Sequence, residues 1–477
     1  MRTRHWAVLL VVGALAACAG PREFTAPEPP VAVPEGFVND GSGAAEAVLA
    51  QGWWRRFGDP ALDALVEEAV RGNLDLRQAA TRVAEVRALL VQAGAADRPA
   101  VTAGASAQRA RNPTPLGDPI ASRYSLSLGF SYEVDLWGRV ANATEAAVQD
   151  LYAAEQDQVR AYHSLVADVV RNYAEMRVAE DQAALSQGTV ENDRQRLGVI
   201  ENRYGKGLSP ALDLYQARQT LAQAESRVFI FRQRAQQASH RLNILRGRYP
   251  AATGEERVAP AALGVPEAVP AGLPADLLAR RPDLRAAERR VAAANARLGV
   301  AEANLYPRFA LTGSGGRVSD AVQDLSVGGN TFWSLLGNLS YPLYNAGANR
   351  AAVSQAEARR QGAVLAFGSA YLEALGQVED VLVSEREQRN RLEALERSVE
   401  LAQRTLEVSQ WRYLRGLDNL TPTLNARNAL FLAQVEQLET RRTLLLNRVS
   451  LFLALGGDWG HEAALVEMTD AVIERDR

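Results

Sequence analysis

The sequence predicts a mainly α-helical protein with a small β part, built from two similar halves. Three observations support this fold class. Proline-free stretches of up to about 65 residues show helical spacing of apolar side chains, short segments alternate strictly between apolar and polar residues, and the same residues recur at a constant offset. We therefore expect long, coiled-coil-like helices that carry four strands, arranged as a two-fold internal repeat.

The N-terminus has the pattern of a targeting segment. Arg2 and Arg4 precede a short apolar run over residues 6–14, and small residues then lead to Cys18, the only cysteine of the chain. The run is too short to span a membrane, which predicts a cleaved signal peptide over residues 1–17. The sequence Leu-Ala-Ala-Cys resembles a bacterial lipobox, which implies lipid attachment at Cys18, and Ala19 in place of an acidic residue implies the outer membrane. The alternative is an ordinary secretory signal with an incidental cysteine.

The rest of the chain is a duplication. Matching positions recur 208 or 209 residues apart, as the following pairs show: Asp75/Asp283, Pro99/Pro307, Tyr132/Tyr341, Gly138/Gly347, Gly207/Gly416, Arg218/Arg427 and Gly247/Gly456. We predict a lipidated, proline-rich spacer over 18–41, a first repeat over 42–247 and a second over 274–456. Residues 248–273, rich in Ala, Pro and Gly, are the predicted linker, and residues 457–477 form a tail.

Each half contains a pair of predicted strands. Apolar residues alternate with Ser, Gly, Glu and Asp over 124–136, and a similar pattern covers 332–344. Weaker partners lie at about 99–108 and 307–316. A segment of this length, tilted by about 45°, crosses roughly 30 Å, the thickness of a bilayer core. Aromatic side chains gather near the strand ends, as they do in interfacial girdles. The alternative is a soluble antiparallel sheet with one wet face.

Four strands are too few to close a transmembrane barrel, which needs about eight. Open sheet edges in lipid would leave backbone groups unpaired at a cost of several kcal/mol each. If the strands span a membrane, several copies of the chain must therefore share one barrel.

The predicted helices follow a length rule. In each half, one helix of about 65 residues (139–203 or 347–412) is matched by two shorter ones (60–96 with 211–246, or 274–304 with 422–455). This predicts a full-length helix antiparallel to two half-length helices. A soluble coiled-coil or spectrin-like bundle explains the helices but not the strands inserted at matching places.

Composition excludes several other classes of protein. The 53 basic and 56 acidic residues give a formal charge of −3, which argues against a nucleic-acid binder. One cysteine, four histidines and three methionines leave little material for an internal disulfide or a transition-metal centre. We find no Gly-rich phosphate loop, zinc-protease motif or nucleophile elbow, so we expect neither a cofactor nor enzymatic activity.

These features together resemble a TolC-like outer membrane efflux protein, of the lipoprotein subgroup of tripartite RND pumps. The resemblance covers nearly all of 42–460. It is carried by the lipobox, the duplicated strand-and-helix layout, the junction 130–139 (FSYEVDLWGR), and the repeated RYxxGL of Arg203–Leu208 and Arg412–Leu417. It implies a homotrimer with a closed 12-stranded barrel and a long periplasmic tunnel. It also implies passive export, with a periplasmic adaptor (membrane fusion) protein and an inner-membrane RND transporter as partners.

The resemblance also implies that the turns at 204–210 and 413–420 are periplasmic tips that close the channel and meet the adaptor. The implied gate residues are Tyr204, Asp213, Gln216, Arg218, Tyr413, Asp418, Asn425 and Arg427. The implied adaptor-contacting residues are Gly205, Lys206, Gly207, Leu208, Ser209, Leu414, Arg415, Gly416 and Leu417. Asn425 stands where relatives often carry Asp, which puts an acidic ring at that level in doubt and favours Asp213.

Two other functions stay open at the level of sequence. One is the outer membrane conduit of a type I protein secretion system, and the other is a periplasmic coiled-coil lipoprotein without a pore. The sequence does not name the transported substrate, because a wide aqueous tunnel need not recognise its cargo.

Overall fold

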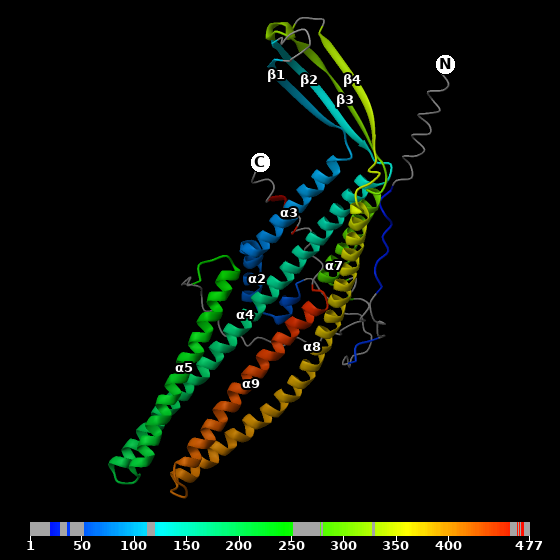
Figure 1. Cartoon of the computed structure of the whole chain (residues 1–477). Coiled ribbons are helices and arrows are strands. Elements are labelled where there is room, and N and C mark those ends of the chain that lie inside the picture. The colour runs from blue at the N-terminus through cyan, green and yellow to red at the C-terminus, as the bar shows by residue number, and fades with distance from the viewer. Residues whose placement is uncertain are drawn as a thin grey trace. The chain divides into compact units, whose positions relative to one another are not determined.

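The computed structural model describes residues 20–28, 36–38, 52–111, 120–250, 277, 280–326, 330–457, 465, 467 and 469–471. These residues form two compact units, shown with their element labels in Figure 1. The first contains the sheet and the helical segments that enter it, within 1–30, 81–156 and 283–370, and the second contains the remaining helical segments, within 31–80, 157–282 and 371–477. Cys18, the predicted signal peptide and nearly all of the predicted linker lie outside the described residues.

The first unit contains a four-stranded antiparallel sheet with strand order β1-β2-β3-β4. Its strands are β1 (Ala100–Arg111), β2 (Ile120–Val134), β3 (Arg308–Ser319) and β4 (Thr331–Ser340). Among the described residues, the outer edges of β1 and β4 pair with no further strand. The sheet is therefore open on both sides.

Two strands end earlier than the alternation of the sequence predicts. β2 ends at Val134 because the Asp135 carboxylate turns back to accept the backbone N–H of Ala141, at 2.8 Å, in the first turn of the next helix. β4 ends at Ser340, and Pro342, which has no N–H to donate, follows shortly after.

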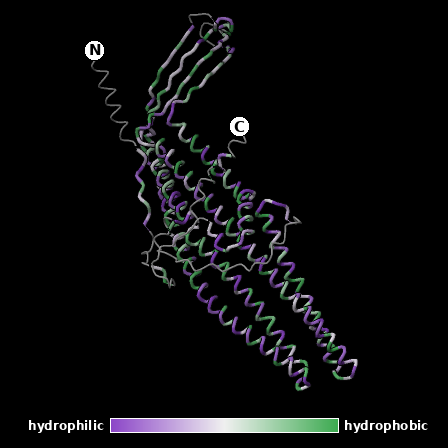
Figure 2. Tube along the Cα trace, turned by 180° about the vertical axis from the view of Figure 1, so that it is seen from behind, coloured by the Kyte–Doolittle hydropathy of each residue, from purple (hydrophilic) through white to green (hydrophobic). Residues whose placement is uncertain are grey.

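The strand register separates an apolar from a polar face, because directly paired residues point to the same side of an antiparallel sheet. Phe130 pairs with Val101 and Gly313, and Leu128 pairs with Ala103 and Gly315. The other face carries small and hydroxylated side chains. There Ser106 bonds to Ser125 at 2.7 Å, and Ser314 bonds to Ser334 at 2.8 Å. In Figure 2 this division appears as alternating colours along the strands.

The helices follow the predicted length rule. α4 (Arg139–Gly205) and α8 (Ala348–Leu414) each contain 67 residues. The shorter helices are α2 (Pro60–Gly72), α3 (Leu74–Ala95), α5 (Ala211–Leu245), α7 (Pro282–Ala303) and α9 (Thr421–Ala454). The predicted helix 60–96 is divided at Asn73. The Asn73 side chain accepts the N–H of Leu76 at 2.8 Å and donates to the carbonyl of Leu245 at 2.9 Å.

Glycines of the repeat end four of these helices in the same way. Gly207 and Gly416 have φ of 73° and 72°, and Gly247 and Gly456 have φ of 69° and 103°. In the first tip, Leu208 donates to the carbonyl of Arg203 at 2.8 Å and Gly207 donates to that of Tyr204 at 2.9 Å, the hydrogen-bond pattern of a Schellman motif. The recurrence of glycine at these positions follows from the left-handed conformation that this helix ending requires.

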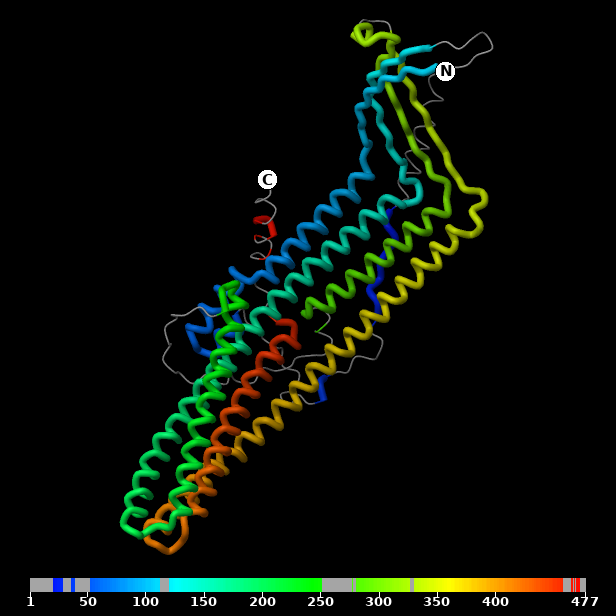
Figure 3. The backbone as a smooth tube through the Cα atoms, turned by 60° about the vertical axis from the view of Figure 1, so that its left-hand side comes forward, coloured from blue at the N-terminus to red at the C-terminus, as the bar shows by residue number. Residues whose placement is uncertain are grey.

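In the second unit, α5 packs along the last part of α4 and α9 packs along the last part of α8 (Figure 3). Ion pairs join the partners, at 2.9 Å between Arg194 and Glu225 and at 3.4 Å between Arg441 and Glu396. We refer to α4/α5 and α8/α9 over these parts as the first and the second hairpin. Among the described helices, none combines the length and the apolarity that crossing a membrane requires.

Candidate functional site

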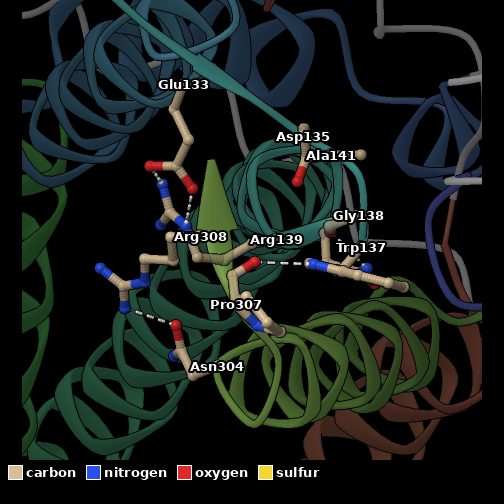
Figure 4. A network of polar contacts seen from close by, with 10 residues as sticks. Glu133, Asp135, Trp137, Gly138, Arg139, Ala141, Asn304, Pro307 and Arg308 are labelled. Atoms are coloured by element: carbon tan, nitrogen blue, oxygen red, sulfur yellow. Dashed lines mark hydrogen bonds and ion pairs between the residues drawn. The ribbon is translucent and has the colours of Figure 1, made fainter. Parts of the chain in front are cut away.

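The junction between β2 and α4 is held by side chains from three segments of the first unit (Figure 4). Arg139 forms two hydrogen bonds of 2.7 Å with the carboxylate of Glu133. The Trp137 ring stacks on Tyr306, with centroids 4.9 Å apart, and its Nε1 donates to the carbonyl of Pro307 at 2.8 Å. These contacts fix the end of the sheet to the start of α4 and to the segment between α7 and β3.

Residues 20–28 are tied to the same region of the first unit. The backbone N–H of Arg22 donates to Asn142 Oδ1 at 2.8 Å, and the Arg22 guanidinium pairs with Glu302. Asn142 is buried and donates in turn to the carbonyl of Gly138 at 2.6 Å. The chain just after Cys18 is thereby anchored where α4 begins and α7 ends.

In the second unit, the turns of the two hairpins meet over a small apolar cluster. Ile200, Leu214 and Ala217 of the first hairpin are buried against Tyr413 and Leu420 of the second. Because these five residues come from both turns, the cluster joins the two tips within one chain. Their separation would expose this apolar surface to water.

One hydroxyl group links the two tips above this cluster. Tyr413, only 7% exposed, donates to Asp213 Oδ2 at 3.4 Å, and its hydroxyl lies 3.4 Å from Ser209 Oγ. Both distances are long for O–H···O hydrogen bonds, which makes each of them weak. The guanidinium carbon of Arg203 lies 5.5 Å from the centre of the Tyr413 ring, a cation–π contact from the first hairpin. We call Asp213, Tyr413 and Ser209 the tip latch.

A buried ion pair forms a second link between the hairpins. Arg427 of α9 pairs with Asp193 of α4, and both side chains are less than a tenth exposed. Arg196 lies 3.3 Å from the same carboxylate. Burial raises the pKa of Asp193, although both guanidinium groups act in the opposite direction. Burial likewise lowers the pKa of Arg427. Removing one member of such a pair would leave the other charge buried without a partner, which is costly in free energy.

The other predicted gate residues have different surroundings. Tyr204 is 44% exposed, Asn425 is exposed, and Gln216 is half-buried. Arg218 is exposed and pairs at 2.9 Å with Glu201 of its own hairpin, whereas Asp418 pairs with Arg412 of its own tip. The structure therefore brings Asp213 and Tyr413 together, and it places Arg427 in the contact between the hairpins.

The predicted adaptor-contacting residues form the surface of the two turns. All of them are exposed except Ser209, whose hydroxyl belongs to the tip latch. Each turn also presents large apolar side chains to solvent. These are Leu208, Leu212 and Tyr215 in the first tip, and Trp411, Leu414 and Leu417 in the second.

Sequence reasoning missed Asp193, the partner of Arg427. It lies within a 67-residue helix in which acidic residues are frequent, and nothing in its immediate sequence distinguishes it from a solvent-exposed acid. Its matching position in the second half is Ala402, so the repeat offset gave no signal for it. Among the described residues, no three His, Cys, Asp or Glu side chains converge as a metal site would require.

The architecture is that of a TolC-like channel protein: a four-stranded sheet with one apolar face, carried by long helices in two repeats. The model of the outer membrane efflux protein family matches residues 65–248 and 273–457. The chain belongs to the outer membrane efflux protein family.

Individual relatives support this assignment. The solvent efflux pump outer membrane protein SrpC of Pseudomonas putida is 34% identical over 408 residues, which cover 84% of this chain and 86% of that protein. Outer membrane protein OprJ of Pseudomonas aeruginosa is 34% identical over 468 residues and 96% of both chains. The open-state structure of the Neisseria gonorrhoeae MtrE outer membrane channel superposes with a TM-score of 0.83, at 27% identity, over 92% of this chain and 98% of that one. By their names, SrpC is the outer membrane protein of a solvent efflux pump and MtrE is an outer membrane channel.

Proposed function

We propose that the chain is the outer membrane channel subunit of a tripartite efflux pump in a Gram-negative cell. In this role it passively conducts substrates from a periplasmic adaptor and an inner-membrane RND transporter to the exterior. The observation that carries the proposal is the open-edged sheet, apolar on one face and polar on the other, that continues into long helices. Such a sheet suits a wall with lipid on one side and water on the other.

The subunit would act as a homotrimer. Three copies of the sheet make 12 strands, with the free edge of β4 paired to the free edge of β1 in the next subunit. That pairing satisfies the edge N–H and C=O groups, which would cost several kcal/mol each if left unpaired in lipid. It places the Ser-rich face toward a water-filled lumen.

Assembly and conduction can be tested on the purified full chain. We expect a trimer that resists dissociation in SDS until heated, and discrete single-channel conductance in planar bilayers. A monomer without conductance would overturn the proposal and favour a coiled-coil lipoprotein without a pore.

The tip latch and the buried ion pair would hold the periplasmic end of the channel closed. They support this assignment because they are polar contacts that join the two hairpins in addition to the apolar cluster. The double variant Asp213→Ala, Tyr413→Phe should raise bilayer conductance and admit vancomycin to cells. Unchanged values of both would count against the latch as a gate.

The exposed apolar side chains of both turns would contact the adaptor. Exposed apolar patches at one place on a protein commonly mark a contact with a partner. Lys206, the only lysine of the sequence, lies in the first turn and offers a single site for amine-directed cross-linking.

We also propose that Cys18 carries a lipid anchor. Arg22, four positions further along the chain, is held where α4 begins and α7 ends, near the base of the sheet, where the periplasmic surface of the membrane would lie. Cys18→Ser should abolish labelling by a palmitate analogue, and persisting label would remove the claim.

A further inference from the structure

The end of the sheet remote from the helices carries arginines that form no ion pair with any described residue. Arg109 and Arg111 lie at the end of β1, and Arg123 lies near the start of β2. All three side chains are exposed. The described residues 100–111 and 120–132 include these three arginines and no carboxylate. The described part of the hairpin β1–β2 is thus basic at this end.

The strand register assigns these arginines to different faces. Arg109 pairs with Ser122 and Arg111 pairs with Ile120, which puts both arginines on the face that carries Leu126 and Leu128. Arg123 pairs with Gln108, on the opposite, Ser-rich face. Both arginines therefore lie on the apolar face of the sheet, as does Arg317 of β3, which pairs with Leu126.

The distance of Arg109 and Arg111 from the helical end of the sheet matches the thickness of a bilayer core. From Ser122, the partner of Arg109, to the end of β2 at Val134 the strand extends about 40 Å, or about 30 Å across a bilayer at a tilt of about 40°. Between Ser122 and Val134, the residues of β2 on this face are all apolar or aromatic, from Tyr124 to Tyr132. Arg109 and Arg111 thus lie at the outer boundary of the apolar band.

The opposite end of the sheet shows that unpaired charge is not a general property of the strands. There Glu133 is neutralised by Arg139 through two hydrogen bonds. At the same end of the sheet as Arg109 and Arg111, Arg317 of β3 donates to the carbonyls of Leu325 and Ser326 at 3.1 Å. Asp320 and Asp324 follow in that connection, and neither forms an ion pair with Arg109 or Arg111.

We propose that Arg109 and Arg111 bind the phosphate groups of lipid headgroups in the outer leaflet. The inference rests on the proposed function, because it takes the apolar face as lipid-facing. Side chains two residues apart on one strand face are separated by about 7 Å, so each guanidinium can engage its own phosphate oxygens in a bidentate manner. The lipid tails would then lie along the apolar residues below. This arrangement makes phosphorylated lipid the occupant that complements both the charge and the apolar surface.

The test compares R109Q/R111Q with R123Q, which removes one positive charge from the same hairpin on the opposite face. The purified full-length trimer is titrated in detergent with bis-phosphorylated lipid A and with lipid A lacking both phosphates, and bound lipid is counted by native mass spectrometry. We expect R109Q/R111Q to lose affinity for the phosphorylated lipid by on the order of fivefold for each arginine, with R123Q within twofold of the parent. The parent should bind the phosphate-free lipid as weakly as R109Q/R111Q does.

Three results would overturn the inference: equal affinity of the parent and R109Q/R111Q, equal affinity for both lipids, or displacement of lipid A by a few millimolar inorganic phosphate. The last would identify a site for a small anion. Single-channel conductance of the same samples separates this outcome from failure of the proposed function. A conducting trimer without lipid preference rejects only the lipid site, whereas a chain that forms no channel rejects the proposed function itself.

Discussion

The two helical tips have the same local sequence layout and the same turn, yet their equivalent side chains have opposite surroundings. Tyr204 is 44% exposed, whereas Tyr413, at the matching position, is 7% exposed and bonded to Asp213. Arg218 pairs with an acid of its own hairpin, whereas Arg427 is buried against Asp193 of the other one.

The two halves share the glycines that the backbone of each turn requires, but they differ in the side chains that form the contact between the hairpins. Gly207 and Gly416 adopt the same left-handed φ. Asp193 and Asp213 have Ala402 and Pro422 at their matching positions, so only the first hairpin offers buried acids to the second. The contact within one chain is therefore asymmetric, although the turns are alike.

The largest difference is expected between the two equivalent arginines. Arg427→Met leaves Asp193 charged and buried without its main partner, which should cost about 3–5 kcal/mol of local stability. Arg218→Met removes an exposed pair and should cost about 0–1 kcal/mol. Hydrogen exchange of α4 and α9 in the purified full-length protein measures both effects. The double variant Asp193→Leu, Arg427→Met should recover most of the loss, and equal costs at the two arginines would contradict the asymmetry.

The two tyrosines should differ next. Tyr413→Phe leaves the buried Asp213 without its hydroxyl donor, at a cost of about 1–3 kcal/mol, and should increase channel conductance. Tyr204→Phe should change stability by less than about 0.5 kcal/mol and leave conductance as it is. Conductance in planar bilayers checks both variants, and an increase in Tyr204→Phe alone would reverse the assignment of the latch.

The two turn glycines should behave alike. Gly207→Ala and Gly416→Ala each force a Cβ into left-handed backbone, at a cost of about 1–2 kcal/mol. No atom lies within 4 Å of the added Cβ at either position, so strain is the only expected contribution. Thermal unfolding should show matching losses, and a loss at one tip alone would mean that the turns are not equivalent.

The smallest effect is the pH dependence of two acids. Burial raises the pKa of Asp193 above its ordinary 3.8, so its contribution to stability is fully present at low pH and is lost as pH rises through the raised value. The hydrogen bond from Arg412 lowers the pKa of Asp418, whose contribution is present above pH 3.8 and is lost only below it.

The free energy of unfolding of the parent, minus that of Asp193→Asn, should therefore increase as pH falls from 7 toward 4. The difference between the parent and Asp418→Asn should stay constant over that range. Chemical denaturation at stepped pH values measures both differences. A constant difference for Asp193→Asn would show that its carboxyl titrates as an ordinary aspartate.

The amino-acid sequence by itself determined the repeat, the faces of the strands and the glycine turns. Each is a local property: strand alternation follows from a two-residue period, and a helix that ends in left-handed backbone favours glycine. The resemblance to known channels also pointed to Asp213 and Tyr413, which the structure brings together. Only the tertiary structure decided that Arg427 is buried and Arg218 is not, and that Asp193 is the partner. The reason is physical: burial depends on which neighbouring hairpin covers a side chain, and that neighbour is more than 200 residues away in the sequence.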